Sequence, residues 1–458
     1  MAEIPKPMAS LYRVIWRWHF YAGLLVLPFL IMMAITGGAY LFKPELDHLI
    51  YRRVEDVPAR EQAIAPASTV IARVESALNG RVIELTPAGG PTSAVRLLVR
   101  VAGGEVRTAF ADPYDGHVTG SMSYGGVMQV IRKIHSLQQF GFWASCLIEI
   151  AAGWTIVLVA TGIFLWWPRG TGGGVVTVRG SPRTRLFWRD LHAVTGAVAG
   201  IVILFLAVTG MPWSMFWGDH VQNWATLAHL GEPAPPAPVT PAWLMTATMP
   251  NMPHAPHVHD GHGTSSLPWA MEQMTAPSSR PPGGGTQPIS IDTALARFRD
   301  LGVHADASIT LPEGPAAPYV ANWRPDRAEE TRVVYLDQYT GARLGDVGFK
   351  EFGPVAQSIE WGIAVHQGQE FGAINRYIML LGCVAIVLLA VSALTMWLKR
   401  RPAGTFGVPP APDFPGAGKG FVAIVVAVGV VFPLVGASLL IAVLANVFGR
   451  RFFVAASP

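Results

Sequence analysis

The sequence has 458 residues, of which 51% are hydrophobic and 14% charged, with a formal net charge of +4 and a mean hydropathy of +0.36. These values exclude an ordinary soluble protein, and the charged residues exclude a chain that lies wholly in lipid. Charge-free runs of about 20 residues or more, the length that a helix needs to cross a bilayer, instead predict an integral membrane α-helical protein.

The apolar runs predict five membrane-spanning helices joined by two long and two short segments. In chain order the predicted parts are helix 10–42, domain 43–134, helix 135–168, basic loop 169–187, helix 188–218, domain 219–365, helix 366–398, loop 399–419 and helix 420–449. Pro433 lies inside the last of these and predicts a kink or a re-entrant turn. The first run is too long for a signal peptide and is expected to remain as an anchor.

The distribution of Lys and Arg predicts the orientation. Basic residues precede the first helix and fill the two short loops, so the positive-inside rule places these segments in the cytoplasm. The two long segments then face the periplasm, and the chain is expected to be a multi-pass protein of a bacterial inner membrane. The same residues explain the pI of about 9.1, which therefore gives no evidence for nucleic-acid binding.

The chain contains an internal duplication. "RWHFYAGLLVLPFLIMMAITGG" and "RDLHAVTGAVAGIVILFLAVTGM" place a histidine (His19 or His192), a glycine and a Thr-Gly pair at identical spacings. Each long segment ends in a further histidine at a matching position, His135 in "HSLQQFG" and His366 in "HQGQEFG". The repeated unit is therefore a helix, an α+β domain, a histidine and a second helix.

The four repeated histidines fit two b-type haem sites. In a four-helix bundle, His19 and His192 would lie at the cytoplasmic face and His135 and His366 at the outer face, which gives each face two axial ligands from different helices. Two such haems would conduct electrons across the membrane. A histidine at a membrane interface is also common as an amphipathic residue with its polar edge in water. The pairing of all four by repeat and by face favours ligation.

Basic residues beside these positions are candidates for pairing with haem propionates. They are Arg17 and Arg189 on the cytoplasmic side and Arg132 and Arg376 on the outer side. The positive-inside rule alone also accounts for arginines at such places.

Two further features remain open. Residues 231–288 form a Pro-, Met- and His-rich insertion, in which a metal site for Cu, Ni or Zn and a flexible linker are both plausible. The candidate ligands there are His254, His257, His259 and His262. Glu149 is the one charged residue of the apolar run 140–168, where it would either move protons or bond to a neighbouring helix.

The motifs "WRWHFYAGLL", "WRDLHAVTGA", "DPYDG" and "HSLQQFG" resemble those of the PepSY-associated transmembrane (PepSY-TM) family, iron-regulated inner-membrane proteins that include ferric-siderophore reductases. The resemblance covers about residues 10–401. It implies periplasmic PepSY domains, a haem-containing membrane core with His19, His135, His192 and His366, and reduction of exported ferric complexes. The insertion 231–288 and the last helix depart from the pattern.

The predicted fold is a pair of duplicated two-helix units that form a four-helix haem-binding bundle, with a fifth helix and two exported α+β PepSY-like domains. The predicted function is that of a haem-dependent membrane ferric reductase, an oxidoreductase in contact with membrane lipid. Electrons would pass from a cytoplasmic or quinol donor through two b-type haems to a ferric siderophore or another Fe(III) chelate. The alternatives are a non-catalytic PepSY regulator, or a metal transporter or metallochaperone that uses the His/Met-rich segment.

Overall fold

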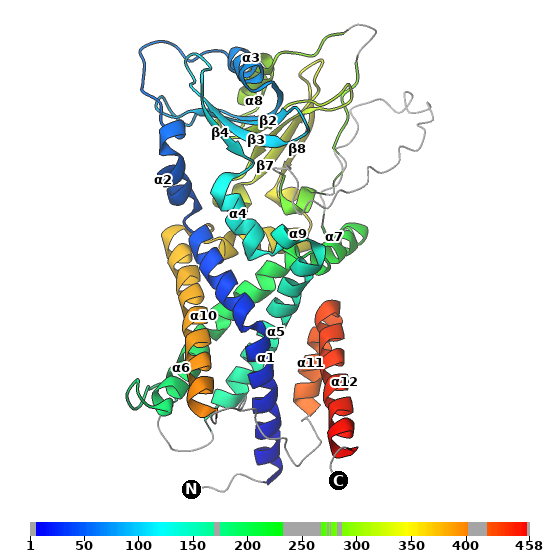
Figure 1. Ribbon diagram of the computed structural model, residues 1–458. Coiled ribbons are helices and arrows are strands. Elements are labelled where there is room, and N and C mark those ends of the chain that lie inside the picture. The colour runs from blue at the N-terminus through cyan, green and yellow to red at the C-terminus, as the bar shows by residue number, and fades with distance from the viewer. Residues whose placement is uncertain are drawn as a thin grey trace. The chain divides into compact units, whose positions relative to one another are not determined.

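The computed structural model describes residues 6–168, 175–231, 267–272, 274, 276–281, 286–401 and 419–455. Its contacts divide the chain into two compact units, whose elements are labelled in Figure 1. The membrane unit comprises Met1–Leu41, Arg132–Val221 and Val365–Pro458, and the sheet unit comprises Phe42–Ile131 and Gln222–Ala364. All four repeated histidines belong to the membrane unit.

Four helices of the membrane unit are long and apolar enough to span a bilayer. They are α1 (Lys6–Tyr40), α5 (Phe142–Trp166), α6 (Arg185–Gly210) and α10 (Gly372–Arg400). A helix satisfies its own backbone N–H and C=O groups, which a segment in hydrocarbon requires. Both α1 and α6 pack against α5 and α10. The four helices therefore form a ring in which α1 and α6, the corresponding helices of the two repeats, face each other across the bundle.

The last apolar segment differs from the single helix predicted over 420–449. It forms α11 (Lys419–Val431) and α12 (Pro433–Ala455), because Pro433 has no N–H to continue the hydrogen-bond ladder of α11. The two helices fold back on each other, and a Cβ added at Gly436 would lie 2.5 Å from the carbonyl oxygen of Gly429 (Figure 1). Glycine at the crossing permits this close approach. The appended segment is a short helical hairpin that packs on α5.

The sheet unit contains one antiparallel sheet of eight strands in the order β4-β3-β2-β1-β5-β6-β7-β8. The strands are β1 (Gly80–Thr86), β2 (Val95–Val101), β3 (Val106–Ala111), β4 (Val118–Ser123), β5 (Ser308–Thr310), β6 (Tyr319–Trp323), β7 (Arg332–Leu336) and β8 (Arg343–Gly348). The sheet unit also contains α2 (Lys43–Glu55), α3 (Ala67–Leu78) and α8 (Ile291–Asp300). The chain passes between the two units within α4 (Gly126–His135), α7 (Trp217–Leu227) and α9 (Pro354–His366).

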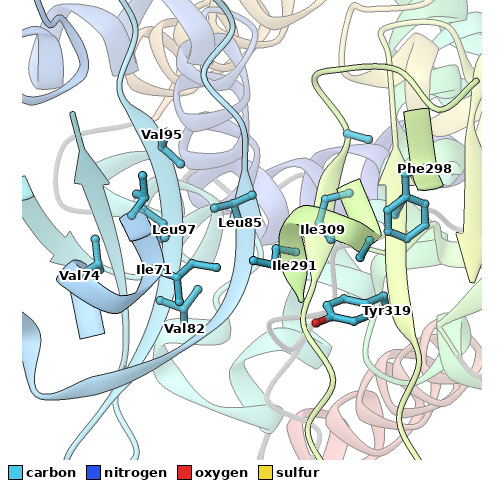
Figure 2. Packing of buried hydrophobic residues seen from close by; sticks show 14 of the residues in the cluster. Ile71, Val74, Val82, Leu85, Val95, Leu97, Ile291, Phe298, Ile309 and Tyr319 are labelled. Atoms are coloured by element: carbon cyan, nitrogen blue, oxygen red, sulfur yellow. The ribbon is translucent and has the colours of Figure 1, made fainter. Parts of the chain in front are cut away.

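The two domains predicted at 43–134 and 219–365 are not separate, because their sheets join at β1 and β5. At this seam Leu85 pairs with Ile309, and Glu84 pairs with Thr310. Each half contributes one helix, α3 or α8, to a single apolar core that includes both seam residues and Phe298 (Figure 2). Burying both inner edges in one ladder removes two exposed strand edges, which are a hazard for aggregation.

The two halves repeat the same hairpin turn between their third and fourth strands. In the first, the carboxylate of Asp112 accepts a hydrogen bond of 2.8 Å from the Tyr114 N–H. In the second, Asp337 accepts one of 2.9 Å from the Tyr339 N–H. Each turn closes on a glycine with positive φ, as the "DPYDG" and "DQYTG" motifs predict.

An ion pair in the second half gives a pH-dependent prediction. Arg332 donates two hydrogen bonds of 2.9 Å to Asp346 and others to the carbonyls at the end of α8. The neighbouring guanidinium lowers the pKa of Asp346 below 3.8. We expect Asp346→Asn to lower the free energy of unfolding by about 1.5 kcal/mol at neutral pH.

The pH dependence follows from the lowered pKa. The contribution of the pair is complete above pH 3.8 and is lost as the pH falls through the lower folded-state value. Denaturant unfolding of wild type and variant should therefore converge in acid. Glu329→Gln, which breaks an exposed pair with Arg327, is the control and should change stability by less than about 0.5 kcal/mol. Parallel pH curves for wild type and D346N would contradict the assignment.

Candidate functional site: two histidine pairs in the membrane unit

The outer histidines end short helices rather than begin membrane spans, which corrects the predicted helix starts at residues 135 and 366. His135 is the last residue of α4 and His366 is the last residue of α9, whereas the spans begin at Phe142 and Gly372. Two residues after each histidine the backbone has positive φ, +54° at Leu137 and +75° at Gly368. This left-handed residue ends the helix and turns the chain toward the span.

The inner histidines face each other across the bundle. His19 lies on α1 and His192 on α6, with ring centroids 6.4 Å apart and ring planes perpendicular. Imidazole–metal bonds are about 2.0–2.1 Å long for zinc, so two such bonds and the two half-rings fit a centroid separation of this size. The spacing therefore suits one iron between the rings, as a bis-histidine haem requires.

The Nδ1 atom of each inner histidine is occupied by the next helix of its own repeat. His19 Nδ1 lies 2.8 Å from the hydroxyl of Thr161 on α5. Since that hydroxyl donates its hydrogen to the Val157 carbonyl at 2.7 Å, it must accept one from Nδ1. His192 Nδ1 lies 3.0 Å from the Ser392 hydroxyl on α10, which donates to the Leu389 carbonyl, and 3.1 Å from that carbonyl oxygen, which can only accept.

The Nδ1 atoms of the outer histidines are also bonded to a spanning helix of their own repeat, but here it is the first helix of the repeat, α1 or α6. His135 Nδ1 lies 2.9 Å from the Thr36 hydroxyl on α1, which donates to the Met32 carbonyl at 2.6 Å. His366 Nδ1 lies 2.9 Å from the Thr209 hydroxyl on α6, which donates at 2.7 Å to its own helix. Each repeat thus anchors both of its histidines through hydroxyl-bearing residues.

These bonds select one tautomer at all four positions. A proton on Nδ1 leaves the Nε2 lone pair of a neutral imidazole, which is the form that binds a metal. The outer rings, which precede the spans, favour the neutral form further, because burial lowers the pKa of His135 to about 4 and that of His366 to about 3. A charge on His135 would lower the pKa of His366 further, and the two rings are held by Thr36 and Thr209, which occupy matching positions of α1 and α6.

A glycine follows three of the hydroxyl residues, and it lies against the ring that the hydroxyl holds. A Cβ added at Gly37 would lie 3.1 Å from Cε1 of His135, and one added at Gly162 would lie 3.3 Å from Cε1 of His19. A Cβ at Gly210 would lie 3.5 Å from Cε1 of His366. The Thr-Gly pair therefore holds an imidazole ring, with the hydroxyl bonded to Nδ1 and the glycine against Cε1; we call this arrangement a hydroxyl seat. The pair was visible in the sequence repeat, but this role was not predicted.

Trp213 contacts the outer pair from the end of α6. Its ring centroid lies 5.8 Å from that of His366, in an edge-to-face arrangement. This contact helps to fix the plane of a candidate ligand ring.

The other candidate residues give a mixed result. Arg189 binds the buried carboxylate of Asp190, with a shortest distance of 2.7 Å, and Arg17 lies over the ring of Tyr21. The propionate role of Arg17, Arg189, Arg132 and Arg376 stays a prediction. The four histidines of the insertion, His254, His257, His259 and His262, lie outside the described residues. Among the residues described, no cluster of three or more His, Cys, Asp or Glu side chains converges on a point.

The hydroxyl seats give a prediction for the outer pair. Thr209→Val keeps the shape of the side chain but leaves the Nδ1–H of His366 without its acceptor, so the ring loses its orientation. Loss of such a partner weakens ligation by about 10- to 100-fold. We expect the variant to lose haem faster than wild type when it is mixed with a haem-free acceptor protein.

Two matched variants test this reading. Thr209→Ser keeps the hydroxyl and should behave like wild type. Thr395→Val removes an exposed hydroxyl on α10 that bonds to its own helix, at 2.8 Å from the Val391 carbonyl, and should have no effect. Equal haem loss from T209V and T395V would contradict a role for the seat.

Comparison with known proteins adds a family match. The model of a family described as PepSY-associated TM region matches residues 16–400, which includes all four histidines and both halves of the sheet. No curated protein matches the chain.

Proposed function

The chain belongs to the PepSY-associated TM region family, and on this basis we propose that it carries electrons across a membrane and reduces a ferric chelate. The proposed route uses two b-type haems, one held by His19 and His192 and the other by His135 and His366. The proposed location is a bacterial inner membrane, with the sheet unit in the periplasm and the amino terminus in the cytoplasm.

One observation carries the proposal: four imidazoles lie in two pairs, and each has its Nδ1–H bonded to a fixed oxygen. Histidines kept for their amphipathic character would have no need of a common tautomer. A bonded Nδ1–H, a free Nε2 lone pair and a partner ring opposite are what bis-histidine ligation of haem requires. The inner pair lies in the first halves of α1 and α6, and the outer pair ends α4 and α9 and bonds to Thr36 and Thr209 near the other ends of α1 and α6, which supports two sites on a route across the bilayer.

A b-type haem held by two histidines accepts and passes on one electron at a time. The protein supplies the ligands, fixes their orientation through Thr36, Thr161, Thr209, Leu389 and Ser392, and surrounds them with apolar helix surface. With two histidines bound, the iron of such a haem would have no position left for a substrate, which would suit electron transfer.

The proposed acceptor is a ferric siderophore or another Fe(III) chelate. Hard oxygen donors hold Fe(III) much more tightly than Fe(II), so one electron is enough to release the metal. The donor is a cytoplasmic reductase or a membrane quinol. The family relationship supports the acceptor; the histidine pairs support the electron transfer.

Sealed vesicles test this function directly. The purified chain is reconstituted with haem into liposomes that enclose a reductant, a ferric chelate is added outside, and Fe(II) is followed with a colorimetric chelator. We expect wild type to reduce the external chelate, and His19→Ala or His192→Ala to abolish the reaction. Reduction at an equal rate by the histidine variants would contradict the proposal and favour a PepSY regulator that is only anchored by its helices.

A further inference from the structure

Glu149 on α5 is a carboxyl group buried within the membrane unit, at 1% exposure. Its Oε2 accepts hydrogen bonds from the N–H groups of Phe216 at 3.3 Å and Trp217 at 3.0 Å, at the first turn of α7. Its Oε1 is buried without a hydrogen-bond partner among the residues that the structure describes. The amino terminus of α7 stabilises the ionised form, whereas burial of an oxygen without a donor favours the acid.

Ser145 lies one turn before Glu149 on the same face of α5. Its hydroxyl oxygen is also buried and has no partner among the described side chains. An acid proton on Oε1 can be donated to the Ser145 oxygen, and an ionised Oε1 can accept from the Ser145 hydroxyl. Ser145 can therefore follow either state of the carboxyl, while burial of Oε1 without a donor is what favours the acid.

The duplication does not account for this pair. At the offset that aligns His135 with His366, Leu380 stands in place of Glu149 and Arg376 in place of Ser145. The appended hairpin of α11 and α12 packs on α5, which belongs to the first repeat. The Glu149 carboxyl, the Ser145 hydroxyl and the hairpin thus have no counterpart in the second repeat, and all three lie on or against α5.

Two tryptophan side chains of the membrane unit donate hydrogen bonds to the hairpin of α11 and α12. The indole N–H of Trp217 donates to the Val431 carbonyl at 2.7 Å, at the break before Pro433. The indole N–H of Trp154 donates to the Ser438 hydroxyl at 3.0 Å. The same tryptophan that offers its backbone N–H to Glu149 therefore also holds the hairpin.

A short segment links Glu149 to the outer histidine pair. Trp213 contacts the ring of His366, and the next residue, Ser214, lies beside the carboxyl of Glu149. Phe216 and Trp217 then bond to the same carboxyl. Five consecutive positions, 213–217, therefore contact the candidate ligand ring at one end and the carboxyl at the other.

We propose that Glu149, with Ser145, is a proton-binding site linked to the redox state of the outer histidine pair, an inference that rests on the proposed haem. When one electron reduces the outer iron from Fe(III) to Fe(II), one proton from water forms an O–H bond at Oε1. The proton returns to water when the iron is oxidised by the acceptor. Net charge in the low-dielectric interior then stays constant, which lowers the cost of placing an electron there.

Few other ionisable groups face the carboxyl. On α5 the neighbour is Cys146, and on α7 they are Asp219 and His220. The part of α6 after His192 has no ionisable residue, and none occurs in residues 420–449, which include most of α11 and α12. Loss of proton uptake on changing Glu149 can therefore be assigned to that residue.

Infrared difference spectroscopy on the haem-loaded full chain tests the proposal. Reduction should produce a carboxylic-acid C=O band in wild type, and Glu149→Gln should lack the band while it keeps the haem content of wild type. The midpoint potential of the outer haem should change by about 59 mV for each tenfold change in proton concentration, the value for one proton per electron. In E149Q the potential should not depend on pH.

Two further variants make the test specific. Glu360→Gln changes a second buried carboxyl, which lies in the sheet unit and accepts from the Ala270 N–H at 3.0 Å, and the band and the pH dependence should remain. Ser145→Ala removes the acceptor of the proposed acid proton and should shift the frequency of the band, which keeps the test valid if E149Q folds poorly. An unchanged band and pH dependence in E149Q would overturn the proposal. A wild-type chain that binds no haem would instead overturn the proposed function, and the redox link with it.

Discussion

Replacing His366 by alanine should reduce the haem content from two per chain to one. The ring of His366 is one half of the outer pair, and Thr209 holds it through Nδ1 so that Nε2 is left to bind a metal; its removal takes away a positioned ligand. The loss of affinity should exceed the 10- to 100-fold that follows loss of a hydrogen-bond partner of a ligand. The measurement is haem per chain by pyridine haemochrome assay, together with the reduced spectrum of the remaining haem.

Combined variants test the pairing. Because His135 and His366 are assigned to one iron, the double variant should lose no more haem than either single one, a non-additivity expected of residues that act as a unit. His19→Ala with His366→Ala should lose both haems. The control is His220→Ala on α7, whose ring stacks on Phe216 rather than on a histidine. A His135/His366 double variant that loses two haems would contradict the assignment.

Truncation of Phe298 should unfold both halves of the sheet unit together. Phe298 is 2% exposed and lies in the core that α3, α8 and six strands share. Replacement of a buried Phe by Ala costs about 3–5 kcal/mol, a large part of the stability of a domain. Hydrogen exchange of the full chain should then speed up at β2 and β3 as well as at β6 and β7.

The two halves are expected to unfold together because β1 and β5 pair at the seam, where Leu85 lies opposite Ile309. Ile64→Ala is the matched control, since that side chain is 58% exposed and its truncation should leave exchange unchanged. Faster exchange restricted to β5–β8 in F298A would show that the halves unfold independently. Such a result would contradict the single core.

The membrane-spanning helices could be predicted from the sequence, because they depend on the length of the apolar runs. The four long apolar runs became α1, α5, α6 and α10, because a bilayer demands about 20 apolar residues in a helix. The sequence does not predict the joining of the two sheets, since Leu85 and Ile309 are ordinary strand residues whose partners lie 224 positions apart. Pro433 was noticed, but whether a proline kinks a helix or folds it back is decided by packing, here by Gly429 against Gly436.

The site divides in the same way. The sequence indicated His19, His135, His192 and His366 because each predicted haem site takes one histidine from each repeat. Its two ligands therefore occur at matching positions of the two repeats. Thr161 and Ser392 could not be found, since each bonds to a histidine that lies at least 142 positions away in the chain. The predicted starts of two helices at the outer histidines were wrong, because a turn of positive φ at Leu137 and Gly368 leaves no strong signal in sequence.

The most direct measurement is the absorption spectrum of the purified chain in detergent, oxidised and reduced with dithionite, with haem per chain measured beside it. Two bis-histidine sites predict two b-type haems per chain and the sharp bands of low-spin iron in the reduced state. A folded, colourless protein from cells supplied with adequate haem would contradict the account. The four histidines would then have to be explained without iron.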